Sequence, residues 1–414
     1  MNNSKINSNK LIELFENKEA TIGIIGLGYV GLPLLLTYVE KGYKVIGFDI
    51  DLEKVDLIGN GKSYIKHIND DRIQKAVDTG LIKLTSKFDL ATQVNALILC
   101  LPTPLNKNRD PDLSYIHSTM ELLTPELQPG QILSLESTTY PGTTEEELKP
   151  IIEDKGLHIG KNFFLVYSPE REDPGNKNYS TTNIPKVLGG ITAECLKVGT
   201  SLYKCIIDKV VPVSSTKAAE MTKLLENIHR AINISLMNEL KPVADAMGID
   251  LYEVIRAAET KPFGFVPYYP GPGMGGHCIP IDPFYLTWKA RQYGMNTRFI
   301  ELAGEINDFM ITYVYQKVIE ALNKDKLPIN GSNILILGLS YKKNIDDTRE
   351  SPSVKILDLL IKNGASVKYS DPYVKQFPVM RDFSFDLESI ELTPQSLETF
   401  DATLLLTDHD IFDY

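Results

Sequence analysis

Residues 21–51, "TIGIIGLGYVGLPLLLTYVEKGYKVIGFDID", are the stretch that decides the fold. A β-prone run at 22–25 is followed by a helical stretch that reaches about Lys41, and a second apolar run follows at 45–48. Between the first run and the helical stretch stand three glycines in G-x-G-x-x-G spacing: Gly26, Gly28 and Gly31. Strand, glycine-rich turn, helix and strand in this order predict a Rossmann-type βαβ unit.

The same stretch predicts a dinucleotide site. In this motif one glycine makes the tight turn, one lets the pyrophosphate approach the backbone, and one allows the helix to pack closely on the strand. The N–H groups at the start of the helix, beside Tyr29 and Val30, would bind the phosphates. Asp49 ends the second run, 18 residues after Gly31, where a carboxylate accepts from ribose hydroxyls. Because a carboxylate repels a 2′-phosphate, we predict NAD rather than NADP.

Further strands are predicted at "ALILCLPTP", "QILSLESTT" and "FFLVYSPE". Their ends carry three polar side chains: Thr103, Thr138 and Glu170. Ligands of open α/β sheets gather at the carboxyl ends of the strands, so these residues are candidates for the site. The alternative for Thr103 and Thr138 is that they only cap turns.

The strand–loop–helix–strand pattern recurs at 333–373, where "NGASVKYSD" echoes "KGYKVIGFD" and puts Asp371 in the place of Asp49. Of the glycine fingerprint only Gly338 remains. The loop carries three cations instead: Lys342, Lys343 and Arg349. A second nucleotide-binding fold is therefore predicted that does not hold NAD in the same way and suits a different phosphate ligand. The alternative is a solvated, charged loop.

Between the two patterns, residues 214–249 predict one long helix, with Ser/Thr capping candidates at its start and few breakers before Pro242. Its apolar faces carry Leu224, Ile228, Ala231 and Ile232. Lys223 and Asn227 are i, i+4 neighbours on one face. Such a helix can line a cleft between two domains or build a dimer interface.

These patterns predict an α/β protein with two Rossmann-like, doubly wound domains joined by a long central helix and a helical middle domain. The expected boundaries are 1–212 for the NAD-binding domain, 213–325 for the helical linker and dimerisation domain, and 326–414 for the second nucleotide-binding domain. At 414 residues, the chain is long enough for two or three domains.

Residues 271–283, "GPGMGGHCIPIDP", place Cys278 in a loop with four glycines and three prolines. The other cysteines are expected to pack: Cys100 as a buried strand residue, Cys195 and Cys205 on a helical segment. Only Cys278 stands where a thiol could face a ligand. His277 is a candidate base for it, although neighbouring side chains usually point apart.

Composition excludes several other classes of protein. The net charge of −11 argues against general nucleic-acid binding, and no apolar run reaches the roughly 18 residues of a membrane span. The six histidines are scattered without a zinc-type motif, so no metal site is expected. The polar N-terminus and the absence of CxxC pairs predict a cytoplasmic protein in a reducing compartment.

The chain resembles the UDP-glucose/GDP-mannose dehydrogenase family over nearly its whole length. The matching motifs are "GLGYVGLP", "ESTTYPGT", "SPERE", "AAEMTKLLEN", "GPGMGGHCIPIDP" and "LGLSYKKNIDDTRESPS". The segments "GKSYIKHI" and "SPEREDPGN", with the stretch around Cys278, look most like the branch that oxidises UDP-N-acetylglucosamine at C6. Dehydrogenases of UDP-N-acetylmannosamine are close relatives, so the epimer at C2 stays open, and UDP-glucose is a further alternative.

The resemblance implies a four-electron oxidation of the sugar's primary alcohol to a carboxylate, with two NAD, in the biosynthesis of polysaccharides. An aldehyde donates hydride poorly until a nucleophile adds to it. A cysteine thiolate gives a thiohemiacetal, which loses hydride to become a thioester that water hydrolyses. Cys278 is the implied nucleophile, and Gly275 and Gly276 would let the backbone approach a bulky sugar.

Further roles follow residue by residue from the resemblance. Lys223 and Asn227 match the donors that stabilise the oxyanion of the intermediates, and Asp282 matches the carboxylate that orients or activates water. The remaining matches contact ligands. Thr138 would hold a water or a substrate hydroxyl and also contact NAD, and Thr103 and Arg349 would bind NAD or close the cleft. Lys342 and Gly275 would contact the nucleotide sugar, and Lys261 a substrate across a dimer. A homodimer or higher homo-oligomer is expected.

One segment departs from the family pattern. "SPEREDPGN" is shorter than the corresponding segment of UDP-glucose dehydrogenases; Glu170 matches the first of their acids, and Glu172 does not align with the second. Asp282, Lys223 and a bound water therefore carry more of the expected acid–base chemistry. Two alternatives remain: a single-step NAD dehydrogenase, against which Cys278 and the second nucleotide fold argue, and a non-catalytic NAD-binding protein.

Overall fold

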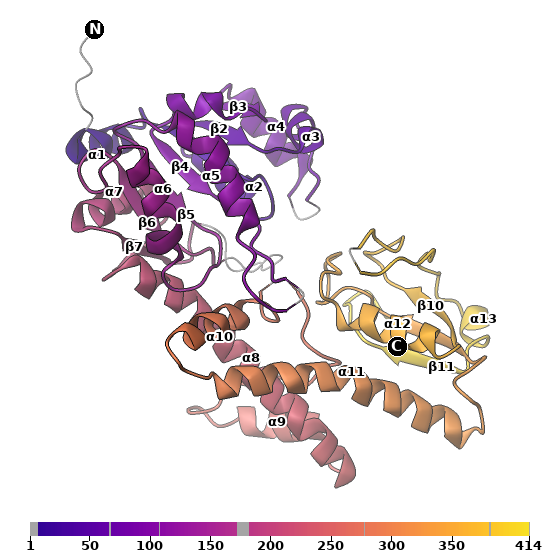
Figure 1. Cartoon of the computed structure of the whole chain (residues 1–414). Coiled ribbons are helices and arrows are strands. Elements are labelled where there is room, and N and C mark those ends of the chain that lie inside the picture. Colours follow the sequence, from indigo (N-terminus) through magenta and orange to yellow (C-terminus); the bar gives the residue numbers. More distant parts are fainter. Residues whose placement is uncertain are drawn as a thin grey trace. The chain divides into compact units, whose positions relative to one another are not determined.

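The computed structural model describes residues 7–65, 68–106, 108–171, 182–276, 278–380 and 382–413. His277 and Glu172 lie outside the described residues, so the predictions made for them stay predictions. The chain divides into two compact units, Met1–Leu225 and Glu226–Tyr414 (Figure 1). Within the described ranges, no helix combines the length and the apolar character needed to span a membrane.

The first unit is built on a sheet that has eight strands within its described residues, in the order β3-β2-β1-β4-β5-β6-β7-β8. The strands are β1 (Thr21–Ile25), β2 (Lys44–Phe48), β3 (Ile82–Thr85), β4 (Ala96–Leu99), β5 (Ile132–Leu135), β6 (Phe164–Tyr167), β7 (Lys186–Gly190) and β8 (Val210–Val213). All neighbours are parallel except β6 and β7. The first six strands have the Rossmann order.

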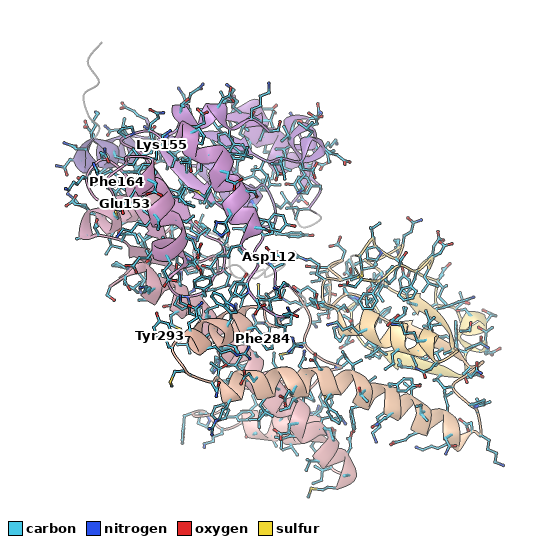
Figure 2. All side chains as sticks on the ribbon, in the orientation of Figure 1. Asp112, Glu153, Lys155, Phe164, Phe284 and Tyr293 are labelled. Atoms are coloured by element: carbon cyan, nitrogen blue, oxygen red, sulfur yellow. The ribbon has the colours of Figure 1, made fainter. Side chains whose placement is uncertain are left out.

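Helices pack on this sheet, and its central strands are buried at every position. Helix α2 contacts β1 and β2, whereas α7 contacts β5 to β8. Because β4, β5 and β6 are covered, they are almost entirely apolar, with Ser134 of β5 as the polar exception, and Phe164 of β6 (Figure 2) is fully buried. The helices are α1 (Ser8–Glu16), α2 (Gly31–Glu40), α3 (Leu52–Gly59), α4 (Asp70–Asp78), α5 (Ser114–Leu123), α6 (Lys149–Asp154) and α7 (Ala193–Lys204), with shorter turns η1 (Phe88–Gln93), η2 (Thr124–Glu126) and η3 (Thr144–Leu148).

Helix α8 (Thr216–Ala246) begins in the first unit and continues into the second. The second unit adds α9 (Leu251–Glu259), α10 (Asp282–Gln292) and α11 (Arg298–Lys324), followed by β9 (Asn333–Leu337), α12 (Pro352–Lys362), β10 (Ser366–Ser370), α13 (Pro394–Leu397) and β11 (Ala402–Leu405). The three strands form a parallel sheet in the order β10-β9-β11, and α11 packs beside α12 (Figure 1).

The predicted α/β fold with two nucleotide-type sheets and a helical middle is confirmed. The long helix is also confirmed, with Leu224, Ile228 and Ala231 buried, and it continues through Pro242. The three boundaries expected from the sequence remain a prediction.

The prediction for Cys100 was wrong. This residue lies just beyond the end of β4 and is half-buried, so it is not a buried strand residue. Its carbonyl oxygen lies 2.4 Å from where a Cβ on Gly26 would stand, so the chain has already turned toward the glycine-rich loop. Cys195 is buried in α7, and Cys205 is half-buried at the C-cap of that helix.

Candidate active site

The glycine-rich turn between β1 and α2 has the geometry that the motif predicts. Gly26 has φ +85°, and its N–H donates to the carbonyl oxygen of Phe48 at 2.9 Å, which makes the tight turn. A Cβ on Gly31 would lie 1.8 Å from the carbonyl oxygen of Gly26, so only glycine allows this helix–strand approach. A Cβ on Gly28 would meet no atom within 4 Å, which leaves the backbone open to a phosphate.

Asp49 follows β2 and supports this turn. Its Oδ2 accepts the N–H of Leu27 at 2.8 Å and its Oδ1 accepts the N–H of Asp51 at 3.0 Å, while the side chain stays almost buried. Tyr64, from the "GKSYIKHI" segment, donates its hydroxyl to the carbonyl oxygen of Leu27 and was missed as a supporting residue. The carboxylate thus has a fixed orientation, as ribose recognition requires.

The start of α2 is left without a side-chain cap. Val30 is the N-cap residue and makes no side-chain capping bond, and Tyr29 before it is 38% exposed. Backbone N–H groups at such a helix start attract phosphate groups. The predicted roles of these two residues are therefore compatible with the local backbone.

The loops after β4 and β5 are joined by their polar side chains. Thr103 donates its hydroxyl to the carbonyl oxygen of Thr138 at 2.7 Å. Ser137 accepts from the N–H of Leu101 at 3.0 Å and donates to the carbonyl oxygen of the same residue at 2.8 Å. Thr103 and Thr138, which the sequence placed at the ends of neighbouring strands, are therefore brought together at one edge of the sheet.

A buried glutamate holds the far end of the same loop. Glu220, on α8, accepts from the N–H of Gly142, from the N–H of Thr144 at 2.9 Å and from the Thr144 hydroxyl at 2.7 Å. Burial raises the pKa of Glu220, and these three donors oppose that rise. Sequence reasoning missed Glu220, although it precedes Lys223 by one helical turn in the motif "AAEMTKLLEN". It links two of the motifs by which the family was recognised.

Glu170 lies after β6 and belongs to a cluster of charged residues. The Nζ of Lys186 is 3.5 Å from the Oε2 of Glu170 and 2.7 Å from the Oε2 of Glu136. Sequence reasoning selected Glu170 and missed the other two. The sequence does place Glu136 directly after one strand and Lys186 at the start of another. Only the pairing of the strands, which the sequence does not show, brings the two together.

Lys223 and Asn227 lie one helical turn apart on α8, as predicted, and both are almost buried, with exposed fractions of 9% and 5%. The amide of Asn227 donates to the Oδ2 of Asp282, the first residue of α10. Asp282 is itself buried, with 3% exposed. Asn227 and Asp282, which are 55 residues apart in the chain, are therefore in direct contact.

Cys278 is exposed, unlike the other cysteines of the described chain, and it lies one turn before Asp282, the first residue of α10. Its carbonyl oxygen accepts from the N–H of Asp282 at 2.8 Å and of Ile281 at 3.2 Å, so its backbone forms the last turn before the helix. Figure 2 marks the position of this helix with Phe284. The residue is thus exposed, and its carbonyl group is fixed by two backbone hydrogen bonds.

The glycines before Cys278 are required by packing inside the protein as well as by the expected approach of a sugar. A Cβ on Gly275 would lie 2.6 Å from the Cβ of Tyr341, and one on Gly276 would lie 2.7 Å from the Tyr341 ring. Gly276 has φ +86° and donates its N–H to the carbonyl oxygen of Arg349 at 3.0 Å. The protein itself fills the space beside them, so the cysteine loop fits against the "LGLSYKKNIDDTRESPS" segment.

In the second sheet, Asp371 has the place of Asp49 but its carboxylate is occupied. Oδ2 accepts from the N–H groups of Leu339 and Ser340 and lies 3.1 Å from the Nε2 of His409. Oδ1 accepts from two more backbone N–H groups, those of Tyr373 and Val374. Burial favours the neutral acid, but the hydrogen bond from His409 and these backbone donors hold the pKa of Asp371 below its ordinary value. This carboxylate is committed to the loop and does not offer a ribose site like that of Asp49.

The cations of this loop differ in their surroundings. Lys342 is half-buried, whereas Lys343 forms a surface ion pair with Asp410 at 2.8 Å, as expected for a solvated loop. The guanidinium of Arg349 lies 2.6 Å from the carboxylate of Asp347. Lys261 is exposed after α9, 5.1 Å above the ring of Phe263. Among the described residues, no group of three or more His, Cys, Asp or Glu is arranged to hold a metal ion.

Known proteins match the chain along almost all of its length. Three models of the UDP-glucose/GDP-mannose dehydrogenase family match: the NAD binding domain at 20–207, the central domain at 217–309 and the UDP binding domain at 335–414. The protein CapL of Staphylococcus aureus is 36% identical over 94% of this chain and 89% of its own length. UDP-N-acetyl-D-glucosamine 6-dehydrogenase of Salmonella typhi is 35% identical over 96% of this chain and 92% of its own.

A solved structure agrees with these matches. The structure of the UDP-D-ManNAc dehydrogenase of Pyrococcus horikoshii superposes with a TM-score of 0.86 and 32% identity, covering 94% of this chain and 90% of that one. The first unit therefore contains an NAD-binding domain and the second a UDP-binding domain. The chain belongs to the UDP-glucose/GDP-mannose dehydrogenase family and is an NAD-dependent nucleotide-sugar dehydrogenase.

Proposed function

We propose that the protein oxidises the C6 alcohol of a UDP-N-acetylhexosamine to a carboxylate, with UDP-GlcNAc as substrate and two NAD consumed per sugar. The Salmonella typhi relative named for UDP-GlcNAc supports this substrate, and the Pyrococcus horikoshii structure named for UDP-ManNAc supports the C2 epimer as the alternative. UDP-glucose is the remaining candidate.

The NAD site is assigned to the turn between β1 and α2. When bound, NAD accepts a hydride from C6 of the sugar in each oxidation step. Gly28 leaves the backbone open for the pyrophosphate, and the N-terminus of α2 supplies N–H donors. Asp49, held by Leu27 and Asp51, accepts from the ribose hydroxyls.

Cys278 is assigned the covalent step. Its thiolate adds to the C6 aldehyde and gives a thiohemiacetal, which loses hydride and becomes a thioester. Water then adds to the thioester carbonyl, the thiolate leaves, and the uronic acid is released. Lys223 and the amide of Asn227 are assigned to the oxyanion, and Asp282 to the orientation of the water.

Glu170 is assigned as the general base that takes the proton of the attacking water, with Thr138 contacting that water or a sugar hydroxyl. Lys342 and Arg349 are assigned to the nucleotide sugar and to NAD or cleft closure, respectively. The observation that carries the proposal is the exposed Cys278 one turn before Asp282, which begins α10 and is hydrogen-bonded to Asn227.

The test is an NADH assay with UDP-GlcNAc, UDP-ManNAc, UDP-glucose and GDP-mannose. We expect the highest kcat/KM with UDP-GlcNAc, because a site built for an equatorial N-acetyl group at C2 leaves buried polar groups unpaired with a sugar that lacks this group or carries it axially. A clear preference for UDP-ManNAc or UDP-glucose would replace the substrate but keep the mechanism. Formation of a single NADH per sugar would contradict the two-step reaction.

The active form is proposed to be a homodimer that uses an apolar row on α8. Four side chains of this row are 38% to 67% exposed and follow one helical face: Leu236, Leu240 and Val243 on α8, and Met247 directly after the end of the helix. A second copy presenting the same row would cover it in an isologous contact. In light scattering we expect twice the chain mass of 46.3 kDa, and a monomer for Val243→Asp. Wild-type protein of monomer mass would refute this proposal.

The reaction is placed in the cytoplasm. None of the four cysteines forms a disulfide bond: Cys100, Cys195, Cys205 and Cys278. A reducing compartment preserves an accessible nucleophilic thiol such as that of Cys278, which oxidation would inactivate.

A further inference from the structure

One antiparallel strand brings a lysine to the carboxyl edge of the first sheet. A strand parallel to β6 would start at the opposite edge of the sheet. β7 is antiparallel to β6, with Val166 paired to Gly190 and Tyr167 to Gly189, and so it starts at the edge where β6 ends. Continuing this register by three residues puts Lys186, the first residue of β7, opposite Glu170. The hydroxyl of Ser168 donates to the carbonyl oxygen of the β7 residue after Lys186 at 2.8 Å, so the two chains stay together beyond the paired strands.

Lys186 is buried between two carboxylates. It is 5% exposed, its Nζ lies 2.7 Å from Glu136 and 3.5 Å from Glu170, and it lies 5.1 Å from the centre of the Tyr203 ring. Burial by itself lowers the pKa of Lys186, but the carboxylates of Glu136 and Glu170 raise it well above its ordinary value. The side chain is therefore a fixed positive charge.

Glu136 is an anchor rather than a reacting group. One of its oxygens accepts from Lys186 and the other accepts from the hydroxyl of Tyr203 at 2.6 Å, which is itself 2.7 Å from the hydroxyl of Ser134. The side chain is wholly buried. Burial raises the pKa of Glu136, and Lys186 opposes this rise. Both oxygens are used inside the protein.

Glu170 differs from Glu136 because its side chain is 17% exposed. Its Oε1 accepts the N–H of Arg171 at 2.6 Å, and the guanidinium of Arg171 donates to the carbonyl oxygen of Pro185 at 2.7 Å. The titratable and charged groups around Glu170 and Lys186 in the described chain come from four neighbouring segments: Glu136 after β5, Arg171 beside Glu170, Tyr203 on α7 and Cys100 after β4.

We propose that Lys186 is a positioning residue that fixes Glu170 as a carboxylate aimed out of the sheet edge, with Glu136 as the counter-charge that keeps the lysine in place. The inference rests on the proposed role of Glu170 as the base for thioester hydrolysis. In that step the water oxygen bonds to the thioester carbon, its proton goes to Glu170, and the Cys278 thiolate leaves. Lys186 touches neither water nor sugar and acts only through Glu170.

The test is the pH dependence of kcat in variants that change the charges around Glu170 separately. Lys186→Met removes the cation that lies 3.5 Å from Glu170 and so should move the acidic limb of the kcat–pH profile to higher pH. Lys186→Met combined with Glu136→Gln should give the same shift without an unpaired buried carboxylate, and so covers a failure of the single variant to fold. Lys186→Arg should restore the wild-type limb, and Tyr203→Phe should leave it unmoved.

Glu136→Gln alone gives the opposite prediction. In this variant Lys186 no longer divides its charge between Glu136 and Glu170. The acidic limb of the kcat–pH profile should therefore move to lower pH. KM for the UDP-sugar should change less than about threefold in all of these variants, because the substituted side chains are not assigned to substrate binding. A limb that stays in place in both Glu136→Gln and the double variant, with kcat lowered equally at every pH, would overturn the proposal.

Glu170→Gln separates this inference from the proposed function. It should remove the acidic limb and lower kcat by about 10²-fold or more, the usual contribution of a general base. If Glu170→Gln kept the limb, the role assigned to Glu170 would be wrong. If it lost the limb while the variants of Lys186 and Glu136 did not move it, only the positioning role would be wrong.

Discussion

Asn227, on α8, donates its side-chain amide to the carboxylate of Asp282, the residue that begins α10. The N–H of Asp282 in turn donates to the carbonyl oxygen of Cys278 at 2.8 Å. One of the two amide hydrogens of Asn227 is therefore used to hold Asp282. Asn227, the proposed oxyanion donor, and Asp282, the proposed water-orienting carboxylate, are therefore linked by hydrogen bonds to the backbone of Cys278.

Asp282→Asn tests the role of Asp282 in hydrolysis of the thioester. The neutral amide keeps the size of the side chain but no longer attracts the attacking water, so the thioester should persist. We expect two NADH to form rapidly per active site, followed by a steady rate lowered by about 10²-fold. Intact-mass measurement after the burst should show the sugar acyl group on the protein. A linear time course with no added mass would exclude a role for Asp282 in hydrolysis.

Lys223→Ala tests oxyanion stabilisation. Removing one oxyanion donor usually lowers kcat by about 10²- to 10³-fold, so we expect a fall on this scale with a smaller change in KM. Lys217→Ala is the matched control, because Lys217 lies on the same helix but pairs with Glu145 at the surface. A higher KM with kcat unchanged would move Lys223 from catalysis to substrate recognition.

Asp49→Asn tests cofactor choice without releasing the turn. The amide oxygen can still accept the N–H of Leu27, but the charge that repels a 2′-phosphate is gone. We expect wild-type protein to prefer NAD clearly, and the ratio of kcat/KM for NADP to that for NAD to rise about tenfold or more in the variant. Equal kcat/KM for the two cofactors in the wild type would refute the role of Asp49.

Asp371 should contribute to the stability of the second unit at all but acid pH. Its pKa is lower in the folded protein than the value of about 3.9 expected for the unfolded chain, so its stabilising effect is complete above that value and is lost as pH falls through the folded pKa. We expect the Tm of Asp371→Asn to lie below that of the wild type by a constant amount above about pH 5, with the gap closing below about pH 4.

Calorimetry across this pH range measures the gap. Asp410→Asn is the control, since Asp410 forms an exposed ion pair with Lys343 and such pairs contribute little. A Tm gap for Asp371→Asn that widened on acidification would contradict the argument.

Much of the fold could be predicted from local pattern. The order of β1, α2 and β2 follows from the spacing of Gly26, Gly28 and Gly31, and the long helix α8 follows from apolar periodicity. The strand β7 could not be predicted as antiparallel, because its direction depends on pairing with β6 rather than on its own residues. The cluster around Lys186 was missed for that reason.

The candidate site was predicted where residues lie close in sequence or at the ends of strands. Thr103 meets Thr138 because neighbouring parallel strands end at one edge. Local pattern did not indicate that Glu220 caps the loop at Thr144, since this depends on the packing of α8 against the sheet's loops. Likewise, Gly275 was explained by a ligand, whereas contact with Tyr341 already requires it.

The central claim is that the thiol of Cys278 forms a covalent bond with the substrate. Its most direct test is the number of NADH formed per UDP-GlcNAc consumed by the wild type and by Cys278→Ser. The substitution keeps the size and the backbone of the loop but replaces the thiolate that traps the aldehyde, since a serine hydroxyl is a much weaker nucleophile at neutral pH. We predict two NADH per sugar and a uronic acid product for the wild type, and at most one slowly formed NADH for the variant, with UDP-GlcNAc and NAD still binding. Two NADH per sugar at a near-normal rate in Cys278→Ser would contradict covalent catalysis by this residue.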